Sequence, residues 1–586
     1  MKIFLVNPAC LDVRITDDDA MSIPIGLYYI GSLMLDRGVD TRVINLAPIK
    51  TPVDYLIELV KSERPDIIGF SVLNANRNCA IDAAIAVKKL NPKISIVFGG
   101  AAPTFIPEYF FRICPALDYI VKGEGEETFI ELLSFHLGKL NIKEIKGLIF
   151  RDNGSIVENS VRPLISNLDS LPHPAKYFAF QHISLSRGCP GRCTFCGSPD
   201  FWGRGKVRFH SANWFVDEME LLVKRGISHF FVSDDTFTMK KKLVIDVCQQ
   251  IIARFINQDI KITWAAISRV DFIDEEILMF MRKAGCIQIS FGVESGSEEI
   301  RKTLGKPFKN ETIIRAFKLT ASFGILPRAY FIYGAPGESE HSINQSVDLI
   351  EQIEPLSMVS YMLVIFPGTA LYSSYGADDI IWEQRIEDIP WFEIDPNLNF
   401  DQVKKFGASL RSAFYSNVHH FALNVRLVDN QELYPYHADF LSRLAMTFSH
   451  GDYSVSSNTN QSVDKASQLQ KSDIYNSKVK HQDTTAKALY ERALSYYPDS
   501  RAYLGLAMLM QKQRDFQGSV AVIKEAFENI LDINSDTNSP TKRQLTLCMA
   551  VSLMNMAKFR EALELIAPFS HYDEIKPYIH ACQSRI

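Results

Sequence analysis

Short apolar segments alternate with helical stretches along most of this chain, and this alternation is the strongest constraint on its fold. In the first 135 residues, five runs rich in β-branched residues are predicted as strands, at 2–7, 41–46, 66–71, 94–99 and 119–122. Their near-continuous apolar character is typical of a parallel sheet that is buried on both faces. Five such βα units predict a doubly wound α/β domain over residues 1–140.

The same alternation starts again after a connector over residues 141–180. The connector contains two short strand patterns on either side of Asn153-Gly154, a dipeptide that favours a tight β-hairpin turn. Six further strands are then predicted at 183–186, 229–233, 260–266, 287–292, 329–333 and 359–365. Six successive βα units predict a partial (β/α)6 barrel over residues 181–400. In both kinds of sheet, ligands bind beyond the carboxyl ends of the strands.

The rest of the chain is expected to be helical apart from one linker. Residues 401–450 are predicted as a helical extension, and residues 451–485 are so rich in polar residues that a flexible linker is expected. From 486 to 586, apolar residues such as Ala486, Tyr490 and Ala493 recur with a period close to 34. This pattern resembles tetratricopeptide repeats, which implies an all-α domain that binds a protein partner; a generic helix bundle is the alternative.

Composition narrows the classes of function. A net charge of −5 over 586 residues provides no basic surface to neutralise phosphates, so binding to nucleic acid is not expected. No apolar run reaches the roughly 18 residues of a membrane-spanning helix, and the N-terminus lacks a secretory pattern. We therefore expect a cytoplasmic protein without a membrane span, whose partner is a small molecule or a protein.

Three of the ten cysteines crowd together directly after the first predicted strand of the second block. Cys189, Cys193 and Cys196 are separated by three and then two residues. Three thiolates on one short loop can hold a metal centre and leave a coordination position open. Two kinds of centre fit this pattern. One is a structural zinc site completed by His182 or His210, and the other is a [4Fe–4S] cluster with one iron free for a ligand.

The motif Cys-x3-Cys-x-Phe-Cys, with Phe195 before the last cysteine, resembles the signature of radical S-adenosylmethionine enzymes. The resemblance covers residues 185 to 370. It implies that the three thiolates bind a [4Fe–4S] cluster whose open iron is chelated by the methionine part of S-adenosylmethionine. Reduction of the cluster then yields a 5′-deoxyadenosyl radical, which implies a one-electron donor such as flavodoxin or ferredoxin.

Polar residues at the ends of two other barrel strands extend this resemblance. Asp234 and Asp235 follow the second strand, where the family carries a motif that accepts hydrogen bonds from the methionine ammonium. Either carboxylate suits this task, and either could instead cap the next helix. Gly334 and Gly337 follow the fifth strand, in a segment that resembles the one whose backbone runs along the adenine; glycine permits such close approach.

The third and fourth strands end in residues that the resemblance also assigns to S-adenosylmethionine. Ser268 and Arg269 end the third strand, and Arg269 could form a bidentate pair with the methionine carboxylate. The alternative is an ion pair of Arg269 with Asp271 or Glu294. Glu294 and Ser295 end the fourth strand, in a segment similar to the one that contacts the ribose.

The first domain resembles the cobalamin-binding domain that precedes the barrel in a large class of these enzymes. The resemblance is carried by residues 24–30, by Gly99-Gly100 and by the glycine-rich segment 123–126. The Asp-x-His-x-x-Gly motif is absent and no histidine precedes His136, so an imidazole from this sheet is not expected to bind cobalt. Two interpretations stay open: cobalamin bound without a histidine, and a domain that has lost it.

The leading hypothesis is an α/β radical S-adenosylmethionine enzyme that uses methylcobalamin as carrier and methylates or rearranges an unactivated carbon of a small-molecule or protein-bound substrate. One alternative keeps the radical chemistry and treats the first domain as vestigial. Another is a non-catalytic scaffold in which a zinc-stabilised barrel displays the C-terminal repeats. The sequence identifies neither the substrate nor a catalytic residue beyond those assigned to the cofactors.

Overall fold

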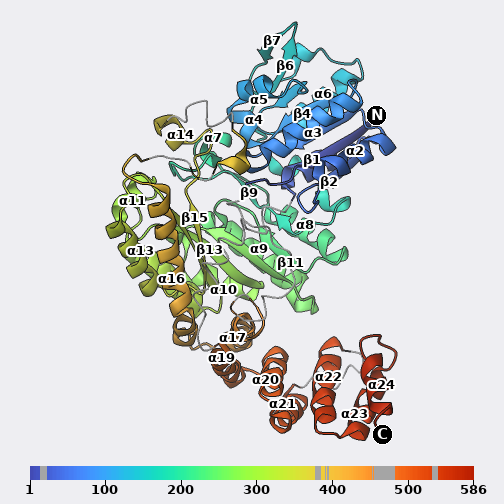
Figure 1. The fold of residues 1–586 in the computed structure, drawn as a ribbon, viewed down its shortest axis with the longest axis vertical. Coiled ribbons are helices and arrows are strands. Elements are labelled where there is room, and N and C mark those ends of the chain that lie inside the picture. The colour runs from blue at the N-terminus through green and yellow to red at the C-terminus, as the bar shows by residue number, and fades with distance from the viewer. Residues whose placement is uncertain are drawn as a thin grey trace.

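The computed structural model describes residues 1–12, 23–375, 384–389, 391, 395–451, 453, 482–530 and 539–586. Figure 1 shows an N-terminal sheet at one end of the long axis, a second sheet in the middle and a row of helices at the other end. Most of the linker expected at 451–485 lies outside the described residues. Among the described helices, none combines the length and the apolar character that crossing a bilayer requires.

Five parallel strands build the N-terminal sheet, and their bounds lie within one residue of those predicted. They are β1 (Lys2–Asn7), β2 (Asp40–Asn45), β3 (Ile67–Ser71), β4 (Ser95–Gly99) and β5 (Tyr119–Val121), in the order β2-β1-β3-β4-β5. Side chains of β1 alternate between two cores, with Phe4 and Val6 in one and Ile3 and Leu5 in the other. Both faces are therefore buried, which confirms the doubly wound α/β prediction.

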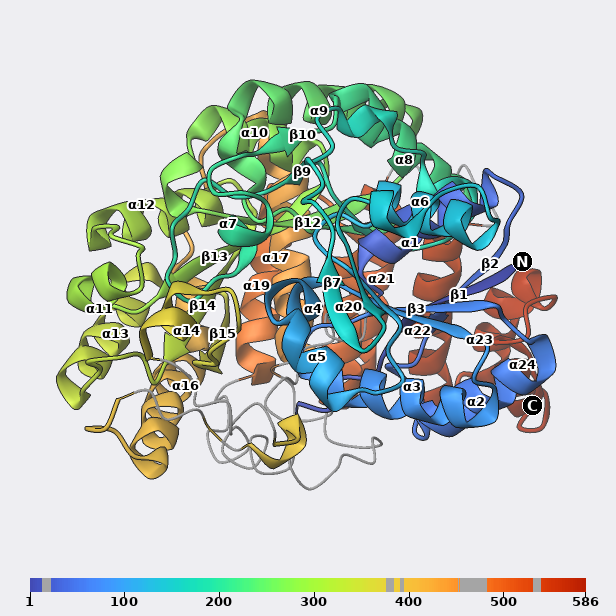
Figure 2. The same cartoon turned by 90° about the horizontal axis from the view of Figure 1, so that it is seen from above.

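Helices cover both faces of this sheet (Figure 2). One core contains side chains from α2 (Pro52–Glu63), α3 (Arg77–Leu90), α4 (Ala101–Phe105) and α5 (Pro107–Ile113). The other contains side chains from α1 (Ile25–Leu35) and α6 (Glu126–His136).

The hairpin predicted in the connector extends the N-terminal sheet. Its strands β6 (Leu148–Asp152) and β7 (Ser155–Glu158) are antiparallel, and β6 pairs with β5. Asn153 and Gly154 have φ angles of 49° and 86°, as the tightest hairpin turns require of both central residues. The sheet is therefore mixed: five parallel strands are extended by a hairpin through two antiparallel pairings.

Six parallel strands form the second sheet, in the order β15-β14-β13-β12-β11-β8. They are β8 (His182–Ile183), β11 (His229–Val232), β12 (Thr263–Ser268), β13 (Cys286–Glu294), β14 (Leu326–Tyr333) and β15 (Ser357–Met362). Every strand pairs with its neighbours in sequence, and β8 and β15 form the two edges, as in a partial barrel. The helices between the strands are α8 (Ala212–Lys224), α9 (Lys241–Arg254), α10 (Glu275–Lys283), α11 (Glu298–Thr303), α12 (Asn310–Ser322) and α13 (Glu340–Ile353).

The first barrel strand is shorter than predicted. It ends at Ile183, because the carboxylate of Asp234 accepts hydrogen bonds from the backbone N–H of Leu185 at 2.7 Å and from the hydroxyls of Ser184 and Ser186. The chain then forms β9 (Ser186–Arg187), which pairs antiparallel with β10 (Arg208–Phe209). This two-stranded ribbon closes the base of the loop that carries the three cysteines.

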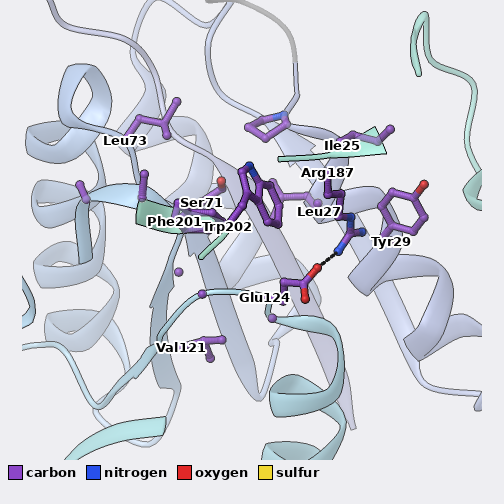
Figure 3. Close-up of a pocket in the computed structure, with 18 of the residues that line it drawn as sticks. Ile25, Leu27, Tyr29, Ser71, Leu73, Val121, Glu124, Arg187, Phe201 and Trp202 are labelled. Atoms are coloured by element: carbon purple, nitrogen blue, oxygen red, sulfur yellow. Dashed lines mark hydrogen bonds and ion pairs between the residues drawn. The ribbon is translucent and has the colours of Figure 1, made fainter. Parts of the chain in front are cut away.

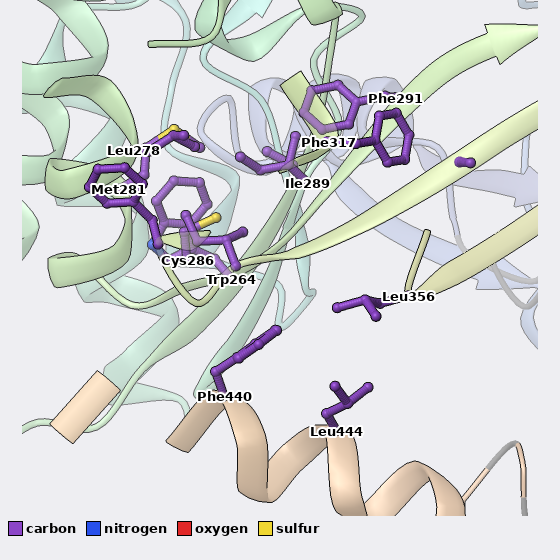
Figure 4. Close-up of a cluster of buried hydrophobic side chains, with 14 of the residues drawn as sticks. Trp264, Leu278, Met281, Cys286, Ile289, Phe291, Phe317, Leu356, Phe440 and Leu444 are labelled. Atoms are coloured by element: carbon purple, nitrogen blue, oxygen red, sulfur yellow. The ribbon is translucent and has the colours of Figure 1, made fainter. Parts of the chain in front are cut away.

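Helix α17 (Tyr434–Ser449) packs against the end of the barrel where the strands begin. Figure 4 shows Phe440 and Leu444 of α17 beside Leu356, which precedes β15, and near Cys286 at the start of β13. Helix α16 (Phe400–Asn424) lies against β15 and α13. Helix α17 therefore contacts the side of the barrel opposite to the carboxyl ends of its strands, whereas α16 also reaches the carboxyl end of β14, where Gly407 lies against Tyr333.

The C-terminal region is all-helical, as predicted. Its helices are α19 (Gln482–Tyr496), α20 (Ser500–Lys512), α21 (Phe516–Asn529), α22 (Pro540–Asn555), α23 (Phe559–Ile566) and α24 (Lys576–Gln583), each packed on the next. Asp439 of α17 joins this region to the barrel through ion pairs with Arg282, Arg443 and Arg501 at 2.8, 2.9 and 2.8 Å. The identity of these helices as tetratricopeptide repeats stays a prediction.

Candidate cofactor site between the two sheets

A cavity of about 640 Å³ lies between the carboxyl ends of the N-terminal sheet and the cysteine loop. Figure 3 shows Ser71 and Val121 on the side of the N-terminal sheet, with Trp202 and Arg187 across the cavity. The lining also includes the glycine-rich strand ends and part of the cysteine loop: Gly99, Gly100, Gly123, Gly125, Gly188, Ser198 and Phe201. The two sheets thus face one shared space.

The cavity continues into the N-terminal domain as an apolar slot. Leu5, Gly69, Val97 and Phe129 line this part, which lies on the face covered by α1 and α6. A Cβ at Gly69 would come within 3.2 Å of the Leu5 side chain and 3.3 Å of the Phe129 ring, so glycine keeps the slot open. A cavity of this volume with a mainly apolar lining suits a small-molecule or cofactor ligand.

The sulfurs of two cysteines converge on a gap beside Gly191. A Cβ built on Gly191 would lie 3.3 Å from Cys189 Sγ, 3.8 Å from Cys193 Sγ and 3.3 Å from Nη1 of Arg269. The hydroxyl of Thr236 lies 3.6 Å from Cys189 Sγ. Within the described residues, no three His, Cys, Asp or Glu side chains surround a single metal ion. A [4Fe–4S] cluster attaches each thiolate to a different iron.

Burial and neighbouring charges act in opposite directions on these thiols. Burial raises the pKa of Cys196 to about 12, and it also raises the pKa of Cys193. The ammonium of Lys306 and the guanidinium of Arg269 lower the pKa of Cys193. Because a metal cluster binds thiolates and displaces their protons, the two cations favour the metal-bound form.

Neither histidine of the zinc alternative is placed to complete a metal site. His210 Nε2 lies 3.2 Å from the Tyr29 hydroxyl and His210 Nδ1 lies 3.2 Å from Asp169, so both ring nitrogens have partners. Nδ1 of His182 lies 2.9 Å from the Ser233 hydroxyl, and the His182 ring stacks on Phe231. The contacts of His210 and His182 therefore do not support the structural zinc site.

The two aspartates after β11 have different surroundings. Asp234 is buried beneath the turn that follows β8, and burial raises its pKa to about 6. Its carboxylate oxygens already accept hydrogen bonds from the backbone and side chains of that turn. Asp235 lines the cavity and accepts a hydrogen bond of 2.5 Å from Ser198, which follows the cysteine motif. Asp235 is therefore the carboxylate of this pair that faces open space.

Arg269 forms the ion pair with Asp271 that the sequence left as an alternative. Its Nε and Nη2 atoms donate to Asp271 at 3.1 and 2.9 Å, and its guanidinium lies 4.8 Å from the centre of the Phe308 ring. The remaining nitrogen, Nη1, lies on the side of Cys189 and Gly191. The ion pair thus orients the guanidinium toward the sulfurs.

Glu294 forms a buried ion pair with Lys306, at 2.7 Å. A Cβ at Gly292 would collide with both charged groups, so glycine at this position makes room for the pair. The pair lies near Cys193, and the negative charge of the Cys193 thiolate helps to raise the pKa of Lys306. Sequence reasoning missed Lys306, because it lies in a loop without a motif; its place 12 residues after Glu294 gave no signal.

The remaining candidates lie in less open positions. Ser268 is buried and bonded to Thr238, and Ser295 is buried and lies 3.3 Å from the Ser346 hydroxyl. Phe195 packs against the core of the N-terminal domain. Gly334 and Gly337 have φ angles of 85° and 77°, in the region that favours glycine.

Comparison with known proteins identifies the class. Residues 183–350 match the Radical SAM superfamily and residues 18–133 match the B12 binding domain. An uncharacterized methyltransferase from Pyrococcus horikoshii is 30% identical over 432 residues, which are 71% of this chain and 92% of the relative. The chain therefore belongs to the radical S-adenosylmethionine superfamily and carries an N-terminal B12-binding domain.

Two solved structures share this fold. The radical S-adenosylmethionine methyltransferase TsrM from Kitasatospora setae, with cobalamin and a [4Fe–4S] cluster bound, has a TM-score of 0.53 and 19% identity, and the match covers 64% of this chain and 76% of that one. The cobalamin-dependent S-adenosylmethionine radical enzyme OxsB has a TM-score of 0.54 and 18% identity, over 95% of this chain and 84% of that one. The cofactors of the present protein are a [4Fe–4S] cluster and S-adenosylmethionine, as predicted, and cobalamin, which the sequence had left open between binding and loss.

Proposed function

We propose that this enzyme methylates an unactivated carbon of a small-molecule or protein-bound substrate, with cobalamin as the methyl carrier. The cavity carries the proposal, because one space touches both the glycine-rich ends of the B12-binding domain and the cysteine loop. A rearrangement that uses the same cofactors is the second candidate. When bound, the cluster and S-adenosylmethionine supply a 5′-deoxyadenosyl radical, and cobalamin supplies a methyl group.

The proposed roles of the chain's own residues follow from their contacts. Cys189, Cys193 and Cys196 bind the iron cluster. Asp235 accepts a hydrogen bond from the methionine ammonium, since Asp234 already bonds three chain donors. Arg269 donates from Nη1 to the methionine carboxylate while Asp271 holds its other two nitrogens.

Other proposed contacts place the nucleoside. Glu294 accepts hydrogen bonds from the ribose hydroxyls, and its ion pair with Lys306 holds its carboxylate in place for that task. The backbone near Gly334 and Gly337 runs along the adenine, and Ser268, Ser295 and Phe195 shape the surrounding wall. Tyr29 and Trp202 supply aromatic surface to the corrinoid side of the cavity.

The partners are proposed from the chemistry. Reduction of the cluster calls for a one-electron donor such as flavodoxin or ferredoxin. The C-terminal helices α19–α24 resemble tetratricopeptide repeats, which supports a role in binding a protein partner.

The test separates methyl transfer from radical formation. Anaerobically reconstituted enzyme is mixed with S-adenosylmethionine and dithionite, with and without hydroxocobalamin. Radical cleavage gives 5′-deoxyadenosine, and methyl transfer to the carrier gives S-adenosylhomocysteine. We expect both products with hydroxocobalamin and only the first without it. If hydroxocobalamin leaves S-adenosylhomocysteine at background, the methyl-carrier proposal is wrong.

A matched pair of cysteine variants controls this assay. Cys193→Ala is expected to abolish 5′-deoxyadenosine formation and to lower the iron content. Cys79→Ala removes a buried free thiol of α3 in the N-terminal domain and is expected to retain both activities. A Cys193→Ala enzyme that still forms 5′-deoxyadenosine would refute the ligand assignment.

A further inference from the structure

The base of the cysteine loop is tied to the B12-binding domain by a buried cluster of four charges. In the ribbon that closes the loop, Arg187 of β9 lies opposite Arg208 of β10. Arg187 donates to Glu124 and to Glu126, both at 2.6 Å. Arg208 donates to the other oxygen of Glu124 at 2.8 Å. We call these four residues the interdomain clamp; Figure 3 shows Arg187 reaching Glu124 at the cavity wall.

All four side chains of the interdomain clamp are largely buried. The side chains of Arg187, Glu124, Glu126 and Arg208 are 10%, 3%, 5% and 12% exposed. Two positive and two negative groups balance in net charge. All the hydrogen bonds of Arg208 within the clamp come from Nη1, and its Nε and Nη2 atoms are buried without a partner among the described residues. The carboxylates of Glu124 and Glu126 raise the pKa of Arg187 further above its usual value, which keeps it charged.

Both ends of the clamp are rigidly connected to a cofactor segment. Only Gly188 separates Arg187 from Cys189, and this turn requires glycine, because its φ is 107° and a Cβ there would collide with the carbonyl of Lys206. At the other end, Glu124 stands between two glycines of the cavity wall and accepts a hydrogen bond from the backbone of Ile165 at 2.7 Å. Displacement of either segment therefore moves the clamp.

A ligand bound in the cavity would contact the interdomain clamp directly. Arg187, Glu124 and Glu126 all line the cavity, and the guanidinium of Arg187 lies 4.9 Å from the centre of the Tyr29 ring, which lines it as well. A ligand in the cavity restricts the segment 123–126, and iron binding restricts the segment 189–196. Because the clamp joins them, a group that orders one segment lowers the entropy lost when the other is ordered.

We propose that the interdomain clamp couples the two cofactor sites, so that binding of the iron cluster raises the affinity for the corrinoid and binding of the corrinoid retains the cluster. The proposal rests on the proposed function, because it takes the cavity as the corrinoid site. Thermodynamic linkage requires the two effects to be equal in size. Arg187 acts here as a positioning residue.

The first measurement is the affinity for hydroxocobalamin of the full-length protein, under anaerobic conditions, with the cluster loaded and after its removal. For the wild type we expect the cluster-loaded form to bind about 5-fold to 10-fold more tightly, within the usual range of coupling. Arg187→Lys keeps the charge but loses the two-pronged donor, so this ratio should fall toward one. Glu126→Gln, which preserves shape, provides the same comparison if Arg187→Lys does not fold.

The control is a second ion pair between the same two parts of the chain. Arg385 pairs with Asp82 at 2.9 Å on the exposed surface and does not line the cavity. Arg385→Lys should therefore keep the wild-type affinity ratio. The reverse measurement follows loss of the cluster's absorbance to an iron chelator; hydroxocobalamin should slow this loss in the wild type and in Arg385→Lys, and have no effect in Arg187→Lys.

The outcomes separate this proposal from the proposed function. Equal corrinoid affinities of the wild type with and without the cluster would overturn the coupling. A wild-type ratio that persists in both Arg187→Lys and Glu126→Gln would overturn the role of the clamp. Absence of corrinoid binding in both the cluster-loaded and the cluster-free wild type would instead overturn the assignment of the cavity.

Discussion

Replacement of Asp234 by asparagine should change how the stability of the protein depends on pH. Burial raises the pKa of Asp234 from 3.8 to about 6 in the folded protein, because the charged carboxylate is removed from water. The folded state therefore favours the protonated form. The stability that this preference contributes is fully present below pH 3.8 and is lost as the pH rises through about 6.

The size of the effect follows from the two pKa values. A difference between 3.8 and about 6, at roughly 1.4 kcal/mol per pH unit, corresponds to about 3 kcal/mol in total. About half of this falls between pH 5 and pH 7.5. Asparagine has nearly the same shape, does not titrate, and can accept the hydrogen bond from the backbone of Leu185.

The assay is thermal unfolding of the cluster-loaded wild type and of Asp234→Asn from pH 5 to pH 7.5. Relative to the wild type, the Tm of the barrel's unfolding transition in the variant should rise by about 3–6 °C over this range, as for a cooperative unit of roughly 200 residues. Asp274→Asn is the control, because the pKa of this helix-capping carboxylate is lowered and it remains ionised throughout; its Tm difference should stay constant. A constant difference for Asp234→Asn as well would refute the reasoning.

Three further substitutions test other parts of the structure. Gly292→Ala should lower the free energy of unfolding by about 1–3 kcal/mol, because its methyl group forces the buried ends of Lys306 and Glu294 to shift. Gly26→Ala meets no atom within 4 Å and is the control; equal urea midpoints of the two variants would contradict this. Asp439→Asn leaves three arginines without a common acceptor and should cost about 3–5 kcal/mol, seen as earlier proteolysis of the C-terminal helices. Arg269→Lys should weaken S-adenosylmethionine binding about 10-fold, followed by the change that it causes in the cluster's EPR spectrum; an unchanged Kd would exclude the proposed contact.

Local patterns were sufficient to locate the strands of the fold, but not every strand end or pairing. Strands such as β1 and β4 are apolar on both faces and end in glycine or asparagine, so their bounds follow from periodicity. The strand after His182 was predicted too long, because its end depends on a carboxylate 50 residues away in the chain. The hairpin was located from Asn153-Gly154, but its attachment to β5 is a long-range pairing that no local pattern contains.

The candidate site was only partly accessible to sequence reasoning. The cysteine spacing and the glycine-rich strand ends marked the two sides of the cavity. The charged residues that pair beside these two sides of the cavity are not neighbours in the sequence. Arg187 and Glu124 are 63 residues apart, and Lys306 lies 12 residues after Glu294. Charged side chains in loops are usually solvated, so only the three-dimensional structure distinguishes these buried pairs from surface residues.

The attachment of the C-terminal helices to the starting ends of the barrel strands limits how they can assist the reaction. Strands such as β12 and β14, with six and eight residues, are about 20–26 Å long, so this distance at least separates α17 from the cysteine loop. A protein held by these helices would have to span at least this distance to reach the radical, which about eight extended residues can do. Substrates presented on flexible tails or on carrier arms meet that requirement.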